Sequence, residues 1–295
     1  MTELDSIIAE LEKSGNVLKD VSARTLTTFG SGGFVSYLVL PKTQEELLKT
    51  LDLLSEQKYH VLGAGSKVII SDNGLKCVVG LKELKGYSVK DDEICAFAGE
   101  YLPILSKVAA QNDLTGLEFA NGIPGTLGGA IRMNAGAFGS DMSKVLKEIT
   151  LYKNGKLYTA TPKELGMRYR DGSLKGAIAI KAVIKLSKGD PERIKYLMKE
   201  NFKARDISQP KEPSAGSVFK RINGNSPAVY AQGAGLKGVR IGGAAVSGKH
   251  SNFIVNLGGA TSRDYLRLSE VVKDKVRDRY GVELEEEFIF MRDKL

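Results

Sequence analysis

Residues 121–139 read NGIPGTLGGAIRMNAGAFG, and this stretch carries six glycines in nineteen positions. Glycine permits left-handed turns that aim consecutive backbone N–H groups at one anion, so this density favours a loop that wraps a phosphate or diphosphate. The alternative is a tight irregular loop whose glycines only allow it to pack against neighbouring chain. We favour the anion-binding interpretation and retain the packing interpretation beside it.

Strands and short helices are predicted on both sides of this loop. Apolar alternation predicts strands at 35–40, 61–62, 68–70, 77–81 and 94–98, and a buried strand at 177–186. Helices are predicted within residues 1–15, after a Thr43–Glu46 capping box, over 104–110 and after Pro162. Asn154-Gly155, between apolar runs at 148–152 and 156–160, predicts a type I′ hairpin. Antiparallel structure is therefore expected after the loop.

The C-terminal third has its own predicted elements. Residues 187–191 are polar and suit a boundary, after which 192–206 are expected to be helical and 208–214 a loop. Strands are predicted at 217–222, 240–246, 252–257 and 282–290, and a long helix at 262–280, ended by Gly281. The sequence thus predicts an α+β chain in three pieces.

Composition excludes several classes of protein. The 295 residues are 42% hydrophobic and 26% charged, as in globular proteins, and the apolar run 176–186 is too short to span a bilayer. The acidic N-terminus does not resemble a signal peptide. Cys77 and Cys95 lie in apolar runs without metal-ligand spacing, and only His60 and His250 are present, so we expect a reduced, cytoplasmic protein without a metal site.

The net charge of +8 predicts anionic partners. Nucleic acid is one class of anion. The chain lacks tryptophan, a zinc knuckle and an aromatic RNA-binding signature, so phosphorylated small molecules are favoured and no nucleic-acid partner is expected.

Four further motifs carry weaker signals. Residues 62–67, LGAGSK, begin like a dinucleotide-binding fingerprint, but Val68 and a strand follow, so a phosphate-facing turn and an ordinary connection both remain. The pattern GAGLKG at 233–238 lacks a βαβ context and is interpreted as a chance match. The charged turn 168–172 and the glutamates at 283–287 have the pattern of solvated surface. Strand alternation would place Glu285 and Glu287 on one face.

An ordered set of motifs resembles one known family. The segments are LGAGS (62–66), EFANGIPGTLGGAI (118–131), MNAGAFG (133–139), YRD (169–171), AGSVFK (215–220), GLKG (235–238), RIGGAAV (240–246) and KH (249–250). Together they resemble the UDP-N-acetylenolpyruvoylglucosamine reductase family, also called UDP-N-acetylmuramate dehydrogenase, flavoenzymes of bacterial peptidoglycan synthesis. The compact length is similar to the shorter of the family's two types.

The resemblance implies a fold and a reaction. The fold is the FAD-binding fold of the p-cresol methylhydroxylase kind, with subdomains at 1–75 (to which a strand at 283–295 returns) and 76–188, and a substrate-binding domain at 189–282. In such enzymes NADPH reduces FAD, flavin N5 delivers hydride to C3 of UDP-N-acetylglucosamine enolpyruvate, and protonation at C2 gives UDP-N-acetylmuramate. A cytoplasmic monomer is expected.

The resemblance also implies roles for named residues. Ser217 matches the proton donor, and Arg170 and Glu287 match the pair that polarises the enolpyruvyl carboxylate. An ionised Glu287 would repel the intermediate, so we expect it to be protonated or hydrogen-bonded through Arg170 or water. Tyr169, Lys220 and Arg221 are the expected substrate contacts. The expected FAD contacts are Gly63, Ala64, Gly65, Ser66, Lys67, Asn121, Gly122, Pro124, Gly125, Thr126, Gly128, Gly129, Ala130, Asn134 and Gly136.

Several positions depart from the family pattern. Lys67 replaces the usual Asn, Gly172 a frequent Ser, and Val229 a lysine that faces the substrate, while Gly30-Ser31 stands where a basic residue is common. Two alternatives therefore stay beside the reductase. One is an FAD-binding relative with another substrate or with lost activity, and the other is a basic nucleic-acid-binding module.

Overall fold

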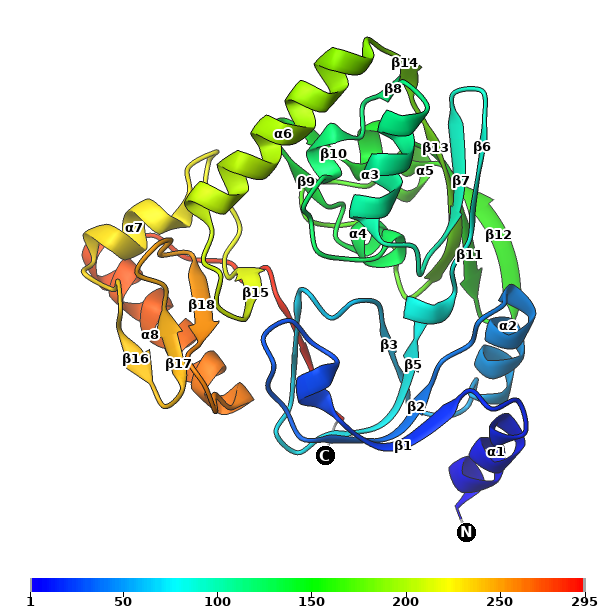
Figure 1. Ribbon diagram of the computed structural model, residues 1–295. Helices are drawn as coiled ribbons and strands as arrows, with labels where there is room; N and C mark the ends of the chain where they lie inside the picture. The colour runs from blue at the N-terminus through cyan, green and yellow to red at the C-terminus, as the bar shows by residue number, and fades with distance from the viewer. Residues whose placement is uncertain (1, 294–295) are drawn as a thin grey trace. The chain divides into compact units, whose positions relative to one another are not determined.

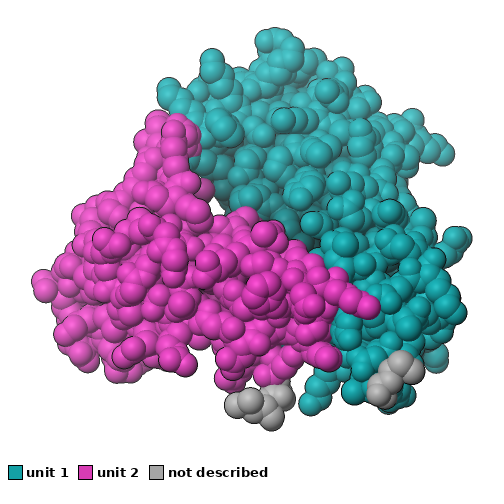
Figure 2. All heavy atoms as spheres, turned by 60° about the horizontal axis from the view of Figure 1, so that its bottom comes forward, with its two compact units in different colours: residues 1–18, 37–64, 77–205 teal, residues 19–36, 65–76, 206–295 magenta. Residues whose placement is uncertain are grey.

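The computed structural model describes residues 2–293, and the chain forms two compact units (Figure 2). Unit 1 comprises residues 1–18, 37–64 and 77–205, and unit 2 comprises residues 19–36, 65–76 and 206–295. Each unit is assembled from three separate stretches, so residues far apart in the sequence meet within one unit. The division at 1–75, with the returning strand 283–295, at 76–188 and at 189–282 stays a prediction.

The larger part of unit 1 is a five-stranded antiparallel sheet packed against two helices (Figure 1). The strands are, in spatial order, β12 (Lys156–Ala160), β11 (Leu146–Lys153), β13 (Ile178–Lys185), β7 (Glu93–Phe97) and β6 (Tyr87–Lys90). Helices α3 (Leu102–Gln111) and α4 (Leu127–Arg132) share a buried apolar core with this sheet. Because α4 is part of the glycine-rich loop, the sheet fixes the position of that loop.

A second core of unit 1 holds two amphipathic helices, α1 (Glu3–Glu12) and α2 (Gln44–Leu53). Helix α1 buries Leu4, Ile8 and Leu11, spaced by one helical turn, and its glutamates are exposed. The neighbouring sheet has the order β1 (Val17–Ser22), β2 (Phe34–Val39), β5 (Leu75–Gly80) and β3 (His60–Leu62). Shorter elements are β8 (Leu114–Thr115), β9 (Gly136–Ala137), β10 (Ser140–Asp141), α5 (Pro162–Leu165) and β14 (Ser187–Lys188). The long helix α6 (Pro191–Ser208) follows β14.

Unit 2 is built on a four-stranded antiparallel sheet and a long helix, α8 (Ser262–Tyr280). The strands are, in spatial order, β15 (Ser214–Ser217), β18 (Phe253–Asn256), β17 (Ala244–Val246) and β16 (Arg240–Ile241). Helix α7 (Pro227–Gly233) packs against α8, and β19 (Ile289–Met291) pairs in parallel with β4 (Val68–Ile70). The parallel pairing brings the C-terminal segment beside residues 65–76. In the described part of the chain, no helix is long and apolar enough to cross a membrane.

Elements with strong local signals are confirmed. Helix α8 has the predicted bounds, its Thr261 side chain caps the N-terminus and Gly281 ends it with a φ of +66°. The predicted hairpin joins β11 and β12 through Asn154 and Gly155, both with positive φ. Strand β4 and helix α3 also lie where the sequence places them.

Four local predictions are wrong. Residues 217–222 are strand only at Ser217, because the Asn252 side chain bonds both the N–H and the carbonyl of Phe219, and the Lys220 N–H donates to the Glu285 carbonyl instead of to β18. Residues 240–246 form two strands rather than one, since Gly242 and Gly243 turn the chain. Residues 282–288 are irregular, and strand begins only at Ile289. The Glu46 carboxylate accepts hydrogen bonds from the Lys42 N–H and from Asn16 instead of completing a capping box.

Candidate functional site

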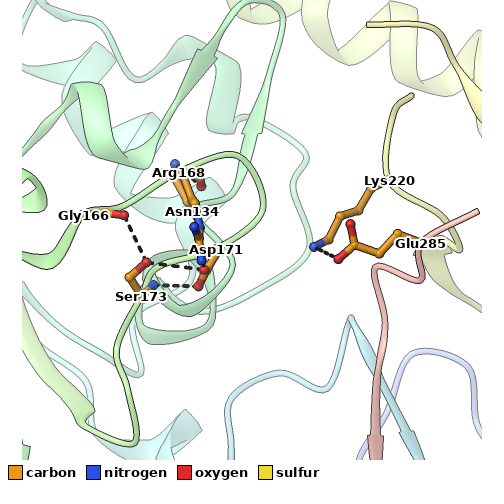
Figure 3. Close-up of polar contacts among 7 residues, drawn as sticks. All are labelled: Asn134, Gly166, Arg168, Asp171, Ser173, Lys220 and Glu285. Carbon is orange, nitrogen blue, oxygen red and sulfur yellow. Dashed lines mark hydrogen bonds and ion pairs between the residues drawn. The ribbon is translucent and has the colours of Figure 1, made fainter. Parts of the chain in front are cut away.

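Residues 168–171 form a tight turn that presents Arg170. The backbones of Arg168 and Asp171 exchange hydrogen bonds of 2.9 and 3.0 Å, and Arg170 between them has a φ of +57°, which side chains rarely adopt. The Asp171 carboxylate accepts from the Ser173 N–H at 2.8 Å and from Arg168 Nε at 3.0 Å (Figure 3). The hydrogen bond from Ser173 is the main cause of a lowered pKa of Asp171. Strained backbone held by such a network is typical of functional sites.

The buried side chain of Asn134 connects this turn to the glycine-rich loop. Its Nδ2 donates to the Arg168 carbonyl at 3.0 Å, and its Oδ1 accepts from the Ser143 N–H at 2.9 Å. Arg170 Nη1 itself donates to the carbonyl of Gly136 at 3.1 Å. The side chain that we expected at the cofactor therefore holds the turn against the loop.

Arg205, near the end of α6, is a candidate site residue that no sequence motif indicated. Its guanidinium lies 5.4 Å from the ring centre of Phe138, and its Cδ is 3.2 Å from the position of a Cβ on Gly122. Burial and repulsion by Arg170 lower the pKa of Arg205. A buried guanidinium that also feels the positive charge of Arg170 favours an anionic partner. Arg205 is one of several basic residues in its helix, and no local pattern distinguishes it.

The glycines of the loop serve different purposes. A Cβ on Gly128 would be 2.9 Å from the Cβ of Ala98, and one on Gly136 would be 2.5 Å from the Asp141 Cβ, so packing requires glycine at both positions. A Cβ on Gly129 would meet only the Thr126 hydroxyl, at an ordinary 3.5 Å. Glycine inside a helix costs about 1 kcal/mol relative to alanine, and no neighbouring atom explains Gly129. A ligand that passes over this position would explain it.

The amides at the start of α4 are already engaged. The N–H groups of Leu127 and Gly128 donate to the carbonyls of Glu100 and Ala98, at 2.7 and 2.8 Å. The Gly129 N–H points to the Thr126 hydroxyl at 3.4 Å. We expected consecutive amides here to wrap a diphosphate, but in this conformation these three donate within the protein. The open face above Gly129 fits a bound dinucleotide better than the helix N-terminus does.

The other expected FAD contacts have varied surroundings. Gly63 approaches Thr126 so closely that a Cβ on Gly63 would be 2.5 Å from the Thr126 hydroxyl. Gly65 has a φ of +66°, and a Cβ on this residue would be 2.1 Å from the carbonyl oxygen of Leu26. Asn121 donates to the Met198 carbonyl at 3.0 Å. Of the rest, Ala130 is buried in the core, Pro124 is exposed, and Ala64, Ser66, Gly122 and Gly125 are half-buried.

Ser217 lies at the end of β15, after the left-handed Gly216 with a φ of +71°. Its neighbours are fixed by Asn252: the Val218 N–H donates to the Asn252 carbonyl at 2.8 Å, and the Phe219 N–H donates to Asn252 Oδ1 at 3.0 Å. The half-buried Ser217 is therefore set on rigid backbone within unit 2.

Glu287 reaches the same part of unit 2, and the surface interpretation of this glutamate is wrong. Its N–H donates to the Val218 carbonyl at 2.7 Å, and its side chain is only 4% exposed. Glu285 is 73% exposed, because the irregular backbone breaks the alternation that would put both on one face. Lys67 Nζ lies 2.9 Å from Glu287 Oε1 and donates to the Ser217 carbonyl at 2.5 Å. Two predicted catalytic residues and Lys67 thus form one cluster.

The expected substrate contacts are less buried. Tyr169 is 49% exposed, and the Arg170 guanidinium lies 5.1 Å from its ring centre. Lys220 pairs with Glu285 at 2.5 Å (Figure 3), and Arg221 donates to the Gly224 carbonyl at 2.8 Å. Their contact with a substrate stays a prediction. Residues 2–293 bring no three His, Cys, Asp or Glu side chains into a metal-binding group.

Two segments of the chain match families of known protein domains. Residues 35–160 match the FAD binding domain family, and residues 209–291 match the C-terminal domain of UDP-N-acetylenolpyruvoylglucosamine reductase. These matches confirm the predicted fold class and FAD as the cofactor. The open face of Gly129 and the positive charges of Arg170 and Arg205 suit an anionic dinucleotide or substrate.

Individual relatives align over nearly the whole chain. A UDP-N-acetylenolpyruvoylglucosamine reductase from Rubrobacter xylanophilus is 40% identical over 275 residues, which cover 91% of this chain and 93% of that protein. The one from Caldanaerobacter subterraneus is 39% identical and covers 97% of both chains. The crystal structure of the Thermus caldophilus enzyme matches with a TM-score of 0.82 at 36% identity, over 93% of this chain and 98% of that one. The chain therefore belongs to the UDP-N-acetylenolpyruvoylglucosamine reductase family.

Proposed function

We propose that the protein reduces UDP-N-acetylglucosamine enolpyruvate to UDP-N-acetylmuramate with NADPH as the reductant. The observation that carries this proposal is the meeting of Ser217 and Glu287 in unit 2. The Glu287 N–H donates to the residue after Ser217, and Lys67 contacts both. These two residues match the family's proton donor and its glutamate, and the names of the relatives state the reduction.

FAD in its binding domain, once reduced by NADPH, supplies the hydride for the enolpyruvyl group. The chain's own residues supply charge, a proton and orientation. Addition of hydride to an enol ether places negative charge on the adjacent carboxylate. A guanidinium at that carboxylate stabilises the transition state more than the ground state.

Arg170 suits this task because its position is fixed. The left-handed turn, the contact of Nη1 with the Gly136 carbonyl and the neighbouring Tyr169 ring hold the guanidinium in place. Little reorganisation is then needed as charge develops.

Ser217 suits proton donation to C2. A serine hydroxyl is a weak acid in water, but beside a strongly basic enolate in a dry site it can transfer its proton. The rigid end of β15 supplies the placement that such a transfer requires.

Steady-state product formation tests the proposed function. The FAD-loaded protein with NADPH should convert UDP-N-acetylglucosamine enolpyruvate to UDP-N-acetylmuramate, detected by chromatography and mass spectrometry. A flavoprotein that oxidises NADPH without this product would instead be a relative with another substrate. Val229, 68% exposed where the family has a lysine, would then be the first position to examine.

We also propose a cytoplasmic monomer that takes a UDP-sugar and binds no nucleic acid. Cys77 and Cys95 form no disulfide, as is usual in a reducing compartment, and this supports the location. Light scattering of the purified protein would give its mass in solution, and a gel-shift assay at low salt would reveal any binding of RNA or DNA.

A further inference from the structure

We propose that Lys67 is a positioning residue that holds Glu287 beside Ser217 and balances the charge of that carboxylate. This inference rests on the proposed function and deepens it. It assigns Lys67, which we expected at the cofactor, to the proton-transfer side of the reaction.

The side chain of Lys67 bridges two segments that lie far apart in the sequence. Its Nζ is 2.9 Å from Glu287 Oε1 and 2.5 Å from the Ser217 carbonyl. The bridge passes directly beside the backbone of Gly216, since a Cβ there would be in ordinary contact with Lys67 Nζ at 3.4 Å and with Cε at 3.6 Å. The φ of +71°, rather than a lack of space, favours glycine at residue 216.

The backbone of Lys67 connects the same segments. Its carbonyl accepts a hydrogen bond of 2.8 Å from the Ile289 N–H, and the parallel pairing of β4 with β19 begins at the next residue, Val68. The Glu287 N–H donates in turn to the Val218 carbonyl at 2.7 Å. Main chain and side chain therefore fix the Glu287 carboxyl relative to Ser217.

Charge explains why this position takes a lysine here. The Glu287 side chain is 4% exposed, and burying a carboxylate is costly unless a cation pairs with it. An asparagine, usual at this position in the family pattern, could donate a hydrogen bond but could not balance the charge. With the ammonium present, an ionised Glu287 repels a developing enolate less. The pairing therefore accounts for a carboxylate close to a negatively charged intermediate.

The test separates the two half-reactions in FAD-loaded Lys67→Asn. NADPH should bleach the flavin at the wild-type rate, and the FAD dissociation constant should be unchanged. Reoxidation of the reduced flavin by UDP-N-acetylglucosamine enolpyruvate should slow about 100-fold, because displacement of a reacting group by about 1 Å costs that much. Lys67→Arg should recover most of the loss, since the guanidinium keeps the charge and the donors.

A matched control is Lys185→Asn, which removes an ion pair of 2.6 Å with Asp92 at the sheet of unit 1. Both half-reactions should keep the wild-type rate in this variant. Three results for Lys67→Asn would overturn the inference. They are reoxidation of the flavin at the wild-type rate, equal slowing of both half-reactions, and weaker FAD binding with a normal reoxidation rate of the FAD-bound protein.

Thermal unfolding tests the pairing of Lys67 with Glu287 independently of the proposed function. It applies even if the flavin of the wild-type protein is not reoxidised by the enolpyruvyl substrate. Lys67→Asn should lower the Tm because it removes the ammonium group that lies 2.9 Å from a buried carboxylate. Adding Glu287→Gln to that variant should raise the Tm again, although Glu287→Gln alone lowers it. Strictly additive changes in Tm would show that the two side chains are not coupled, and would contradict the proposal.

Discussion

Replacement of Gly129 by alanine should have opposite effects on stability and on FAD binding. The added Cβ lies 3.5 Å from the Thr126 hydroxyl, an ordinary contact, so nothing in the protein opposes it. Alanine in a helix is favoured over glycine by about 0.5–1 kcal/mol, and the flavin-free variant should gain that much free energy of unfolding.

The bound cofactor should meet the new methyl group. Overpacking of a fitted contact costs about 1–3 kcal/mol, which is roughly a 5- to 150-fold increase in Kd. Denaturant unfolding of the flavin-free protein and titration with FAD, followed by flavin fluorescence, measure the two effects separately.

Gly128→Ala is the matched control on the same helix. Its Cβ would be 2.9 Å from the Cβ and 3.2 Å from the carbonyl oxygen of Ala98, so this variant should lose stability in the flavin-free state. Wild-type affinity for FAD in a stabilised Gly129→Ala protein would refute the argument that the cofactor passes over this position.

Three further outcomes are expected. Ser217→Ala should leave bleaching of the flavin by NADPH intact and reduce reoxidation by the enolpyruvyl substrate about 100-fold or more, measured by stopped flow; fast reoxidation would exclude Ser217 as the proton donor. Arg170→Lys should lower kcat for product formation about 100-fold, since an ammonium cannot replace a fixed guanidinium at a planar carboxylate; an unchanged kcat would remove Arg170 from the mechanism. Burial and the hydrogen bond to Asp52 raise the pKa of Tyr152 from 10.0 to about 12. The stability that this shift contributes is complete below about pH 10 and is lost as the pH rises towards 12, and Tyr152→Phe should lack this loss in unfolding experiments at alkaline pH.

The sequence predicted correctly those elements that begin or end at a capping or turn residue. Helix α8 is capped by Thr261 and ended by Gly281, and the hairpin after β11 turns at Asn154-Gly155, so each is specified within a few residues. Residues 240–246 show the limit of such signals, because the two adjacent glycines read equally well as part of a strand and as a turn.

The glycine-rich loop was predictable in place but not in detail. Its density pointed correctly to a special backbone in an FAD binding domain. Whether close packing requires a given glycine depends on residues from other segments. Ala98 contacts the position of Gly128, and Asp141 contacts that of Gly136. The packing interpretation therefore holds for Gly128 and Gly136, and ligand binding at Gly129 stays a prediction.

The cluster around Glu287 could not be found by local reasoning. A run of glutamates near a chain end has the pattern of solvated surface, and only the pairing of β19 with β4 carries Glu287 to Lys67. The family resemblance named Ser217 and Glu287, but it did not show that the unusual Lys67 joins them. Arg205 was missed for a similar reason, since tertiary contacts alone place it beside Gly122 and Phe138.

An anaerobic experiment in two steps tests the central claim most directly. The oxidised flavin spectrum of the purified protein is recorded, the flavin is bleached with NADPH, and UDP-N-acetylglucosamine enolpyruvate is added. The proposed function predicts rapid return of the oxidised spectrum with one UDP-N-acetylmuramate formed per flavin. A flavin that stays bleached in the presence of this substrate would contradict it.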